Sequence, residues 1–126
     1  MRYLVLLVVL AGCTAYDPQA RTKDQQQLAQ DLADRTRGEP ENCIPTEQSQ
    51  GLTIVDESTI VSRRGRTIWV NQLRAPCPGL RPLDTLIVEV PSGQHCSGDR
   101  VRSVTPGTSI PGPVCILGEW TPYRAD

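Results

Sequence analysis

The chain has 126 residues, which is enough for one small domain and too few for two. Its 13 Lys and Arg residues balance 14 Asp and Glu residues, which argues against nucleic acid or another polyanion as a partner. With no Phe, two Trp and three Tyr, the core has to be built mainly from Val, Ile and Leu. A chain of this length buries a modest fraction of its surface, so we expect cross-links among its five cysteines.

The N-terminus has the organisation of a secretory signal. Arg2 is followed by an apolar run at 4–10, which is far shorter than the roughly 20 residues that span a bilayer. A short run behind a basic residue is typical of a signal peptide. The run ends in Leu10-Ala11-Gly12-Cys13. This stretch resembles the lipobox of bacterial lipoproteins, which consists of a Leu, two small residues and an obligatory Cys.

The lipobox resemblance implies a processing step and a location. Residues 1–12 would be the lipoprotein signal peptide, and Cys13 would carry the lipid as the first residue of the mature chain. The expected partner is then a membrane, contacted through acyl chains of the palmitate type. In enteric lipoproteins an Asp after the Cys retains the protein at the inner membrane. Thr14 stands there instead, which favours the outer membrane, facing the periplasm. The alternative is an ordinary signal peptide with a chance Cys.

Residues 13–42 form the predicted tether. The segment is rich in Gln, Asp, Arg and Thr, and Leu28 and Leu32 form one narrow apolar seam. This spacing predicts a short helix that is ended by Gly38 and Pro40. Two leucines cannot hold a helix together alone, so we favour a solvated spacer that is helical part of the time. The alternative is a helix that docks on the domain or on a partner.

The folded domain is expected at 43–126. Thr, Val, Ile and turn residues dominate this region, and strands are predicted at 51–56, 59–62, 67–73, 85–90, 99–104 and 114–120. Gly65 suits the turn of a hairpin formed by the second and third of these strands. The nearly continuous apolar run at 85–90 indicates a central strand. These features predict an all-β fold, a small antiparallel sandwich or partly open barrel of five or six strands.

Four cysteines remain once Cys13 is assigned to lipid, namely Cys43, Cys77, Cys96 and Cys115. Because the periplasm is oxidising, we expect two disulfides. No C-x-x-C motif is present, so a zinc site is not predicted. Three pairings are open. We favour Cys77–Cys96, which flanks the apolar strand, and Cys43–Cys115, which joins the start of the domain to its last strand.

Four blocks of the domain resemble a family of small proteobacterial envelope proteins of unknown function. The blocks are "TIVDESTIV", "GRTIWVNQLRAPCPGL", "HCSGDRV" and "CILGEW". The resemblance extends over about residues 43–121 and implies these domain limits and the four-cysteine framework. It implies no activity.

The sequence predicts no catalytic residues, no cofactor and no metal. His95, the single histidine, precedes Cys96 in a polar stretch, and we expect it in a surface turn. The carboxylates Asp56, Glu57, Asp84, Glu89 and Asp99 are scattered along the chain, and none are paired for acid–base chemistry. Asp56 and Asp99 are expected to accept hydrogen bonds from turn backbones.

One concentrated group of charges stands out, formed by Arg63, Arg64 and Arg66. It is a candidate contact for anionic lipid headgroups, lipopolysaccharide phosphate or an acidic partner. The alternative is a soluble hairpin end. For Trp69 and Trp120, we expect one or both in the core and at most one on a ligand surface.

These features favour a non-enzymatic lipoprotein of the cell envelope, a binding or structural module with an envelope protein as its partner. The first alternative is a hydrolase of an envelope polymer, whose carboxylates only the fold brings together. The second is an inhibitor or sensor that blocks an enzyme through the proline-containing loop at 105–113.

Overall fold

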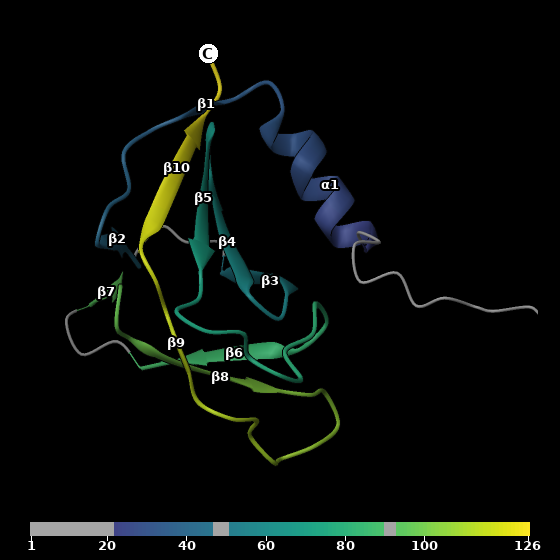
Figure 1. The fold of residues 1–126 in the computed structure, drawn as a ribbon. Helices are drawn as coiled ribbons and strands as arrows, with labels where there is room; N and C mark the ends of the chain where they lie inside the picture. Colours follow the sequence, from purple (N-terminus) through teal and green to yellow (C-terminus); the bar gives the residue numbers. More distant parts are fainter. Residues whose placement is uncertain (1–21, 47–50, 90–92) are drawn as a thin grey trace, which may run out of the picture.

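A computed structural model describes residues 22–46, 51–89 and 93–126, so the predicted signal peptide and Cys13 lie outside the described residues. The described elements comprise one helix and ten strands (Figure 1). They are α1 (Lys23–Leu32), β1 (Thr36–Arg37), β2 (Cys43–Pro45), β3 (Leu52–Asp56), β4 (Thr59–Arg64), β5 (Thr67–Gln72), β6 (Thr85–Val88), β7 (Gln94–Cys96), β8 (Arg100–Val104), β9 (Cys115–Ile116) and β10 (Trp120–Arg124).

The strands form three antiparallel sheets. The largest has the order β1-β10-β5-β4-β3, a ribbon is made by β2 and β7, and a third sheet has the order β6-β8-β9. The predicted all-β, antiparallel class is therefore confirmed. The sheets remain open and do not close into a barrel in the described residues. The predicted number of five or six strands was too low. Strands β1, β2 and β7 have only two or three residues each and carry no periodic pattern, and the strand predicted at 114–120 is divided between β9 and β10.

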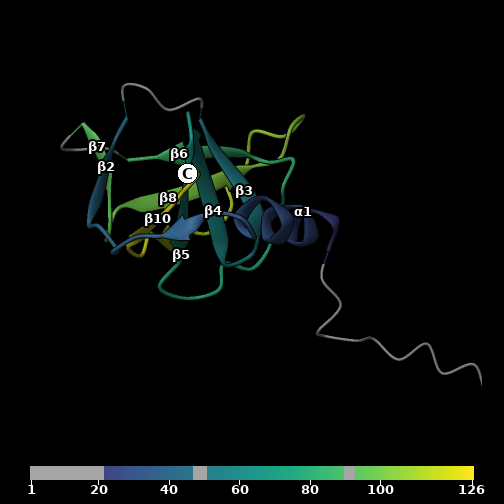
Figure 2. The ribbon, with the colours of Figure 1, turned by 90° about the horizontal axis from the view of Figure 1, so that it is seen from above.

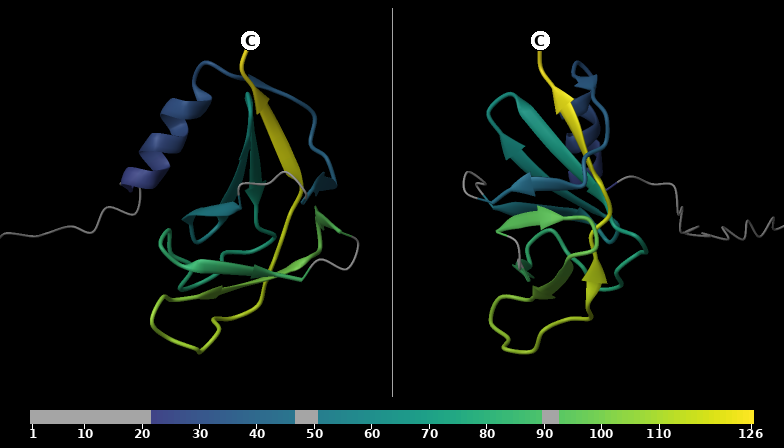
Figure 3. Two further views of the ribbon diagram at one scale, coloured as in Figure 1. Left: turned by 180° about the vertical axis from the view of Figure 1, so that it is seen from behind. Right: turned by 90° about the vertical axis from the view of Figure 1, so that its left-hand side faces the viewer.

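The five-stranded sheet buries side chains on both of its faces. Neighbouring residues of β4 show this, because Ile60 joins the larger core cluster whereas Val61 packs toward α1. The larger cluster lies between this sheet and the two smaller ones, and includes Trp69, Val101 and Trp120. Helix α1 covers the other face, and the β2–β7 ribbon lies on the opposite side of the molecule from α1 (Figures 2 and 3). The molecule is therefore layered as helix, sheet and smaller sheets.

Helix α1 docks on the five-stranded sheet. Thr22 and Gln25 form a capping box at its start, since each side chain accepts from the other's backbone N–H. Leu28 is buried against Val55, Val61, Ile68 and Val70, and Leu32 packs at the edge of the same cluster. The favoured interpretation, a solvated spacer, is therefore wrong for this segment. The alternative of a docked helix is correct, because the sheet supplies the apolar surface that the leucine seam lacks in isolation.

The folded part of the chain begins before the predicted boundary at Cys43. Strand β1 pairs with β10, so the helix ends at Leu32 rather than at Gly38 and Pro40. The Gly38 N–H donates to the Pro122 carbonyl at 2.8 Å. A Cβ at position 38 would lie 2.9 Å from Pro122 Cγ, so glycine permits this close approach. Gly38 thus continues the strand pairing.

The predicted hairpin is present. Strands β4 and β5 pair from Thr59 opposite Gln72 to Arg64 opposite Thr67, and Gly65 in the turn has φ +58°. The prediction of a central strand at 85–90 was wrong. Strand β6 is the edge of the three-stranded sheet, and only Leu86 and Val88 of this strand pack on the core. Its apolar run resembles that of a strand buried on both faces, but Ile87 is half exposed.

Strand β10 contains a proline in the interior of the largest sheet. The Pro122 carbonyl accepts from Gly38, so this residue directs its backbone polar groups toward β1. Strand β1 ends at Arg37, directly opposite Tyr123. The N–H that proline lacks is therefore on the β1 side, where the regular pairing gives way to the single hydrogen bond from Gly38 and to a bridge between Glu41 and Trp120. The β5 side of the strand remains complete.

Two disulfides join the four cysteines of the domain, as predicted, but the predicted pairing was wrong. The bonds are Cys43–Cys96 and Cys77–Cys115, and neither Cys77–Cys96 nor Cys43–Cys115 forms. Cys43 and Cys96 are directly opposite each other in the β2–β7 ribbon, with Cα atoms 4.0 Å apart. The pairing of β2 with β7 places Cys43 beside Cys96 and so determines the disulfide. The sequence could not predict this ribbon, because strands of three residues carry no periodic pattern.

Candidate functional site

At the hairpin turn, the arginines Arg63 and Arg66 make contacts within the protein. Arg63 Nη2 lies 2.7 Å from Asp31 Oδ2 of helix α1, with both side chains partly exposed. The carbonyl of Arg66 accepts hydrogen bonds from the Arg35 guanidinium and from the Ala125 N–H. The turn therefore fastens α1 and the C-terminal segment to the sheet. An anionic contact at Arg63, Arg64 and Arg66 stays a prediction.

Both tryptophans are core residues, which is one of the two outcomes predicted above, namely one or both in the core. Trp120 has no exposed surface, and 9% of the surface of Trp69 is exposed. The Arg124 guanidinium carbon lies 5.8 Å from the centre of the Trp69 ring, which is within the range of a cation–π contact.

His95 is buried, so the predicted surface turn was wrong. It lies in β7 opposite Ile44, with 7% of its surface exposed. Its carbonyl accepts a hydrogen bond from the Trp120 indole at 3.0 Å, while its Nδ1 atom is buried with no partner in the structure. Burial lowers the pKa of His95 from its usual value, and the Asp99 carboxylate offsets part of this shift by raising it.

A cavity of about 350 Å³ lies beside His95. Its walls are Gly51, Leu52, Asp84, Thr85, Leu86, Val88 and His95. The Oδ2 atom of Asp84 is also buried without a hydrogen-bond partner. A neutral imidazole and a carboxylate that line the same cavity can bind a small molecule that offers hydrogen-bond donors. This is the candidate binding site that sequence reasoning missed, because Asp84 lies in the turn before β6 whereas His95 lies in β7, in another sheet.

Two predicted turn caps are present. Asp56 Oδ1 accepts from the Ser58 N–H at 2.8 Å, and Asp99 Oδ2 accepts from the Cys96 N–H at 2.8 Å. Asp56 also accepts from the Gln25 side chain of α1 at 2.8 Å. The predicted role of both carboxylates in turn structure is confirmed.

A buried amide contact joins two of the sequence blocks. Asn71 Nδ2 donates to the Gly118 carbonyl at 2.8 Å, and the Gly118 N–H donates to Asn71 Oδ1 at 2.9 Å. Asn71 has no exposed surface. A Cβ at position 118 would lie 2.1 Å from the Gln72 carbonyl oxygen, so the two backbone segments meet where only glycine fits. The contact holds the segment before β10 against the end of β5.

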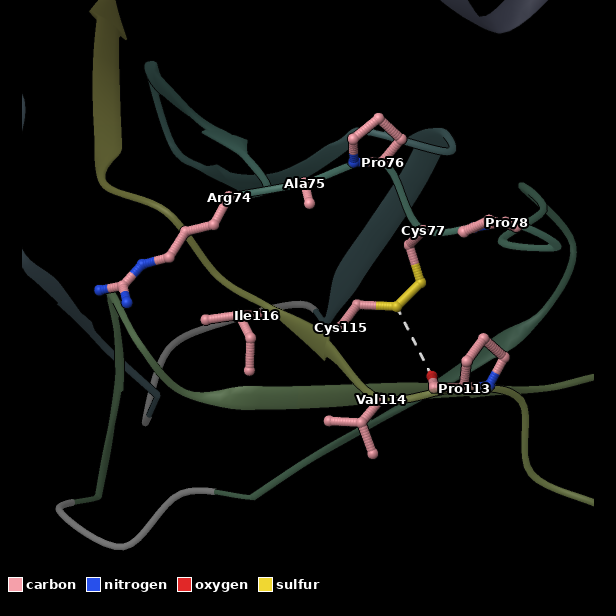
Figure 4. Close-up of a pocket in the computed structure, with 9 residues that line it drawn as sticks. All are labelled: Arg74, Ala75, Pro76, Cys77, Pro78, Pro113, Val114, Cys115 and Ile116. Carbon is pink, nitrogen blue, oxygen red and sulfur yellow. Dashed lines mark hydrogen bonds between the residues drawn. A yellow bond between two sulfur atoms is a disulfide. The ribbon is translucent and has the colours of Figure 1, made fainter.

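An apolar groove of about 140 Å³ runs along the Cys77–Cys115 disulfide (Figure 4). Prolines 76, 78 and 113 line it with Val114 and Ile116. Cys115 Sγ lies 3.5 Å from the Pro113 carbonyl oxygen, a contact without a donated proton because both sulfurs are in the disulfide. Arg74 extends away from the disulfide, and its Nη2 donates to Ser97 Oγ at 3.2 Å. The groove therefore presents apolar carbon and a backbone carbonyl, with no nucleophile.

Two classes of site lack support in the part of the chain that the structure describes. No group of three or more His, Cys, Asp and Glu residues is placed to hold a metal ion there. The one helix in the described residues, α1, has ten residues and is too short to cross a bilayer.

Comparison with known proteins gives one match. No curated protein and no solved structure is detectably similar to this chain. A family model described as a family of unknown function, DUF6491, matches residues 1–119 and so includes the N-terminal segment as well as nearly all of the β domain. The chain belongs to the DUF6491 family.

Proposed function

We propose that this protein is a lipoprotein of the cell envelope, anchored through Cys13 and acting as a non-enzymatic binding or structural module. The observation that carries the proposal is the division of the five cysteines. Two disulfides use Cys43, Cys77, Cys96 and Cys115, so Cys13 has no cysteine left to pair with within the chain. The lipobox-like stretch gives this fifth cysteine a role.

The disulfides also support an oxidising compartment. Structural disulfides persist in the periplasm and are rare in the cytosol. Removal of either bond from a small domain costs about 2–5 kcal/mol. A domain with this dependence fits a chain that is exported before it folds. We assign it to the periplasmic side of the outer membrane, on the ground that Thr14 follows the cysteine.

The motif residues support a module rather than an enzyme. The cysteines, Asn71, Gly118 and Asp99 carry the resemblance to the envelope family, and each holds the backbone in place. The cavity beside His95 has one carboxylate, Asp84, among its lining residues. The alternative of a polymer hydrolase requires a second carboxylate near the first, and the described residues that line the cavity include none. We expect the protein's partner to be recovered by cross-linking in intact membranes.

Substitution of the lipobox cysteine tests the proposal. Cys13→Ala should abolish incorporation of labelled palmitate and either block processing or release the chain from the membrane fraction. Thr14→Ala is the matched control, because it changes the neighbouring residue and leaves the thiol. A Cys13→Ala chain that is still processed and membrane-bound would show that the anchor lies elsewhere.

A further inference from the structure

Exposed apolar side chains are concentrated in one part of the domain. In the residues that the structure describes, four large apolar side chains are exposed: Leu83 by 87%, Ile110 by 78%, Ile87 by 50% and Val114 by 41%. All four belong to the segment 83–114, which contains β6, β8 and the loop that leads to β9. Ile87 lies on β6, and the other three lie in the segments next to β6 and β9. Single exposed apolar residues are ordinary, but several on neighbouring segments are typical of an interaction surface.

The three-stranded sheet turns one face toward the core and one face outward. Its inward residues on β6 and β8 are Leu86, Val88, Val101 and Ser103. Because side chains alternate along a strand, Ile87, Arg100 and Arg102 point the other way. Ile87 is opposite Arg102 in the ladder, and Arg100 is opposite Ile116. The outer face therefore alternates arginine with isoleucine.

The outer face carries a local excess of positive charge. Arg100 and Arg102 are exposed, and neither side chain has an ion pair or hydrogen bond in the described residues. Arg81, also exposed, lies in the turn before β6. Glu89 is exposed as well, and its N–H donates to the Arg100 carbonyl, so one acidic residue lies opposite Arg100 on β8. In a chain whose charges balance overall, this arrangement favours an anionic partner surface.

The N-terminal segment enters the domain at the rim of this face. Lys23 and Asp24, at the start of α1, line one hollow together with Leu83, Thr105 and Pro106. In Figure 1 the start of α1 lies beside the end of the molecule that holds β6 and β8. Nine peptide units separate Thr22 from Cys13, and they can extend over about 30 Å at most. A membrane that holds Cys13 is therefore within about 30 Å of this rim.

We propose that the outer face of the three-stranded sheet lies on the membrane that holds Cys13. Arg100 and Arg102 contact anionic lipid headgroups, and Ile87 between them enters the headgroup layer. A basic face with apolar side chains is the composition by which peripheral segments bind anionic bilayers. The inference rests on the proposed anchor. The short segment between Cys13 and Thr22 keeps this face close to the membrane, which favours lipid over a protein as its occupant.

Site-specific photo-crosslinking tests the orientation in the full-length chain. The photoreactive residue p-benzoylphenylalanine replaces Ile87 in one variant and Thr36 in the other, in cells whose phospholipids carry labelled phosphate. Thr36 is a matched control because it is exposed, lies on the edge strand β1 at the other end of the molecule, and is nearer to Cys13 in sequence. A domain that swings on its tether would label both positions alike.

The expected result is a lipid adduct at Ile87 whose yield is at least about fivefold higher than at Thr36, the factor that one basic residue at an anionic surface contributes to binding. Equal yields overturn the orientation. An adduct with a protein at Ile87, in place of lipid, also overturns it. Palmitate labelling of the same samples separates the two proposals. Labelled chains with equal yields reject the orientation alone, whereas unlabelled chains reject the anchor and the orientation with it.

A charge-reversal pair tests the role of the arginines. Arg100→Glu with Arg102→Glu should lower the lipid adduct at Ile87 by about fivefold or more, without loss of palmitate label. Arg37→Glu is the control, since this residue is exposed on β1, near the other end of the molecule, and belongs to neither arginine group. An unchanged adduct in the first variant, with intact disulfides, contradicts a contact between these arginines and anionic lipid.

Discussion

Asn71 shows how one side chain determines the path of a segment far away in sequence. Its amide makes two hydrogen bonds with the backbone of Gly118, and all of these groups are buried. A buried amide with matched partners is stabilising, whereas the same amide with one partner lost carries the full cost of its desolvation. The glycine is required because the Gln72 carbonyl occupies the space that a Cβ would need.

Gly118→Ala should therefore lower the free energy of unfolding by about 3 kcal/mol, through overpacking and loss of the buried hydrogen bonds. Gly65→Ala is the control. Its Cβ would meet no atom within 4 Å, so it tests only the cost of a positive φ, about 1 kcal/mol. Urea unfolding of the full chain measures both. Equal losses in the two variants would contradict the role of the close approach.

His95 predicts a pH dependence of stability. Burial lowers its pKa in the folded protein, while the unfolded chain keeps a pKa near 6.5. As the pH falls below about 6.5, protons bind preferentially to the unfolded chain, so the free energy of unfolding decreases. The stabilisation is fully present above about pH 6.5 and is lost toward the lower folded pKa.

His95→Gln should remove this part of the pH dependence and leave the acid unfolding that carboxylates cause at lower pH. Since the chain has a single histidine, its ring proton signals are assigned without ambiguity by NMR. A midpoint above 6.5 for the folded protein would show that Asp99, rather than burial, controls the pKa of His95.

At the scale of elements, the largest departure from the sequence predictions is helix α1. Leu28 and Leu32 predicted its apolar face correctly, but the sequence could not show which surface covers that face. Long-range packing against Val61 and Ile68 decides this, and the Asp31–Arg63 ion pair adds an exposed contact worth at most about 1 kcal/mol. The helix is therefore held mainly by apolar burial.

Leu28→Ala should destabilise the folded protein by about 2–3 kcal/mol, because it removes the buried side chain at the centre of the helix contact. Gln30→Ala, at an exposed position of the same helix, should change the free energy of unfolding by less than about 0.5 kcal/mol. Protease sensitivity of the helix gives a second measurement. If Leu28→Ala behaves like Gln30→Ala, the helix does not dock in solution.

The predictable elements were those with strong local patterns. The hairpin of β4 and β5 was found because alternating residues flank a glycine turn. Strands β2 and β7 could not be found, since three residues show no period, and the disulfide pairing was mistaken for that reason. The cavity was missed for a similar cause. Asp84, in the turn before β6, and His95, in β7, are separated by 11 positions, and only the fold brings both to the lining of one cavity.

For the whole molecule, the arrangement of layers determines how far the proposed anchor at Cys13 lies from the outer face of the three-stranded sheet. Helix α1 closes one side of the five-stranded sheet and begins at the rim of the outer face formed by β6, β8 and β9. Both disulfides lie on the other side of that sheet, where one closes the β2–β7 ribbon and the other joins the loop after β5 to β9. The start of α1 therefore lies beside the turn that leads into β6 and the loop that follows β8.

The intact mass of the protein purified from membranes tests the central claim most directly. The account predicts a mature chain that begins at Cys13, carries acyl groups on that residue, and lacks four hydrogens because of its two disulfides. Peptide mapping of the same sample should join Cys43 to Cys96 and Cys77 to Cys115. A mature chain that begins at another residue, or that has an unmodified Cys13, would contradict it.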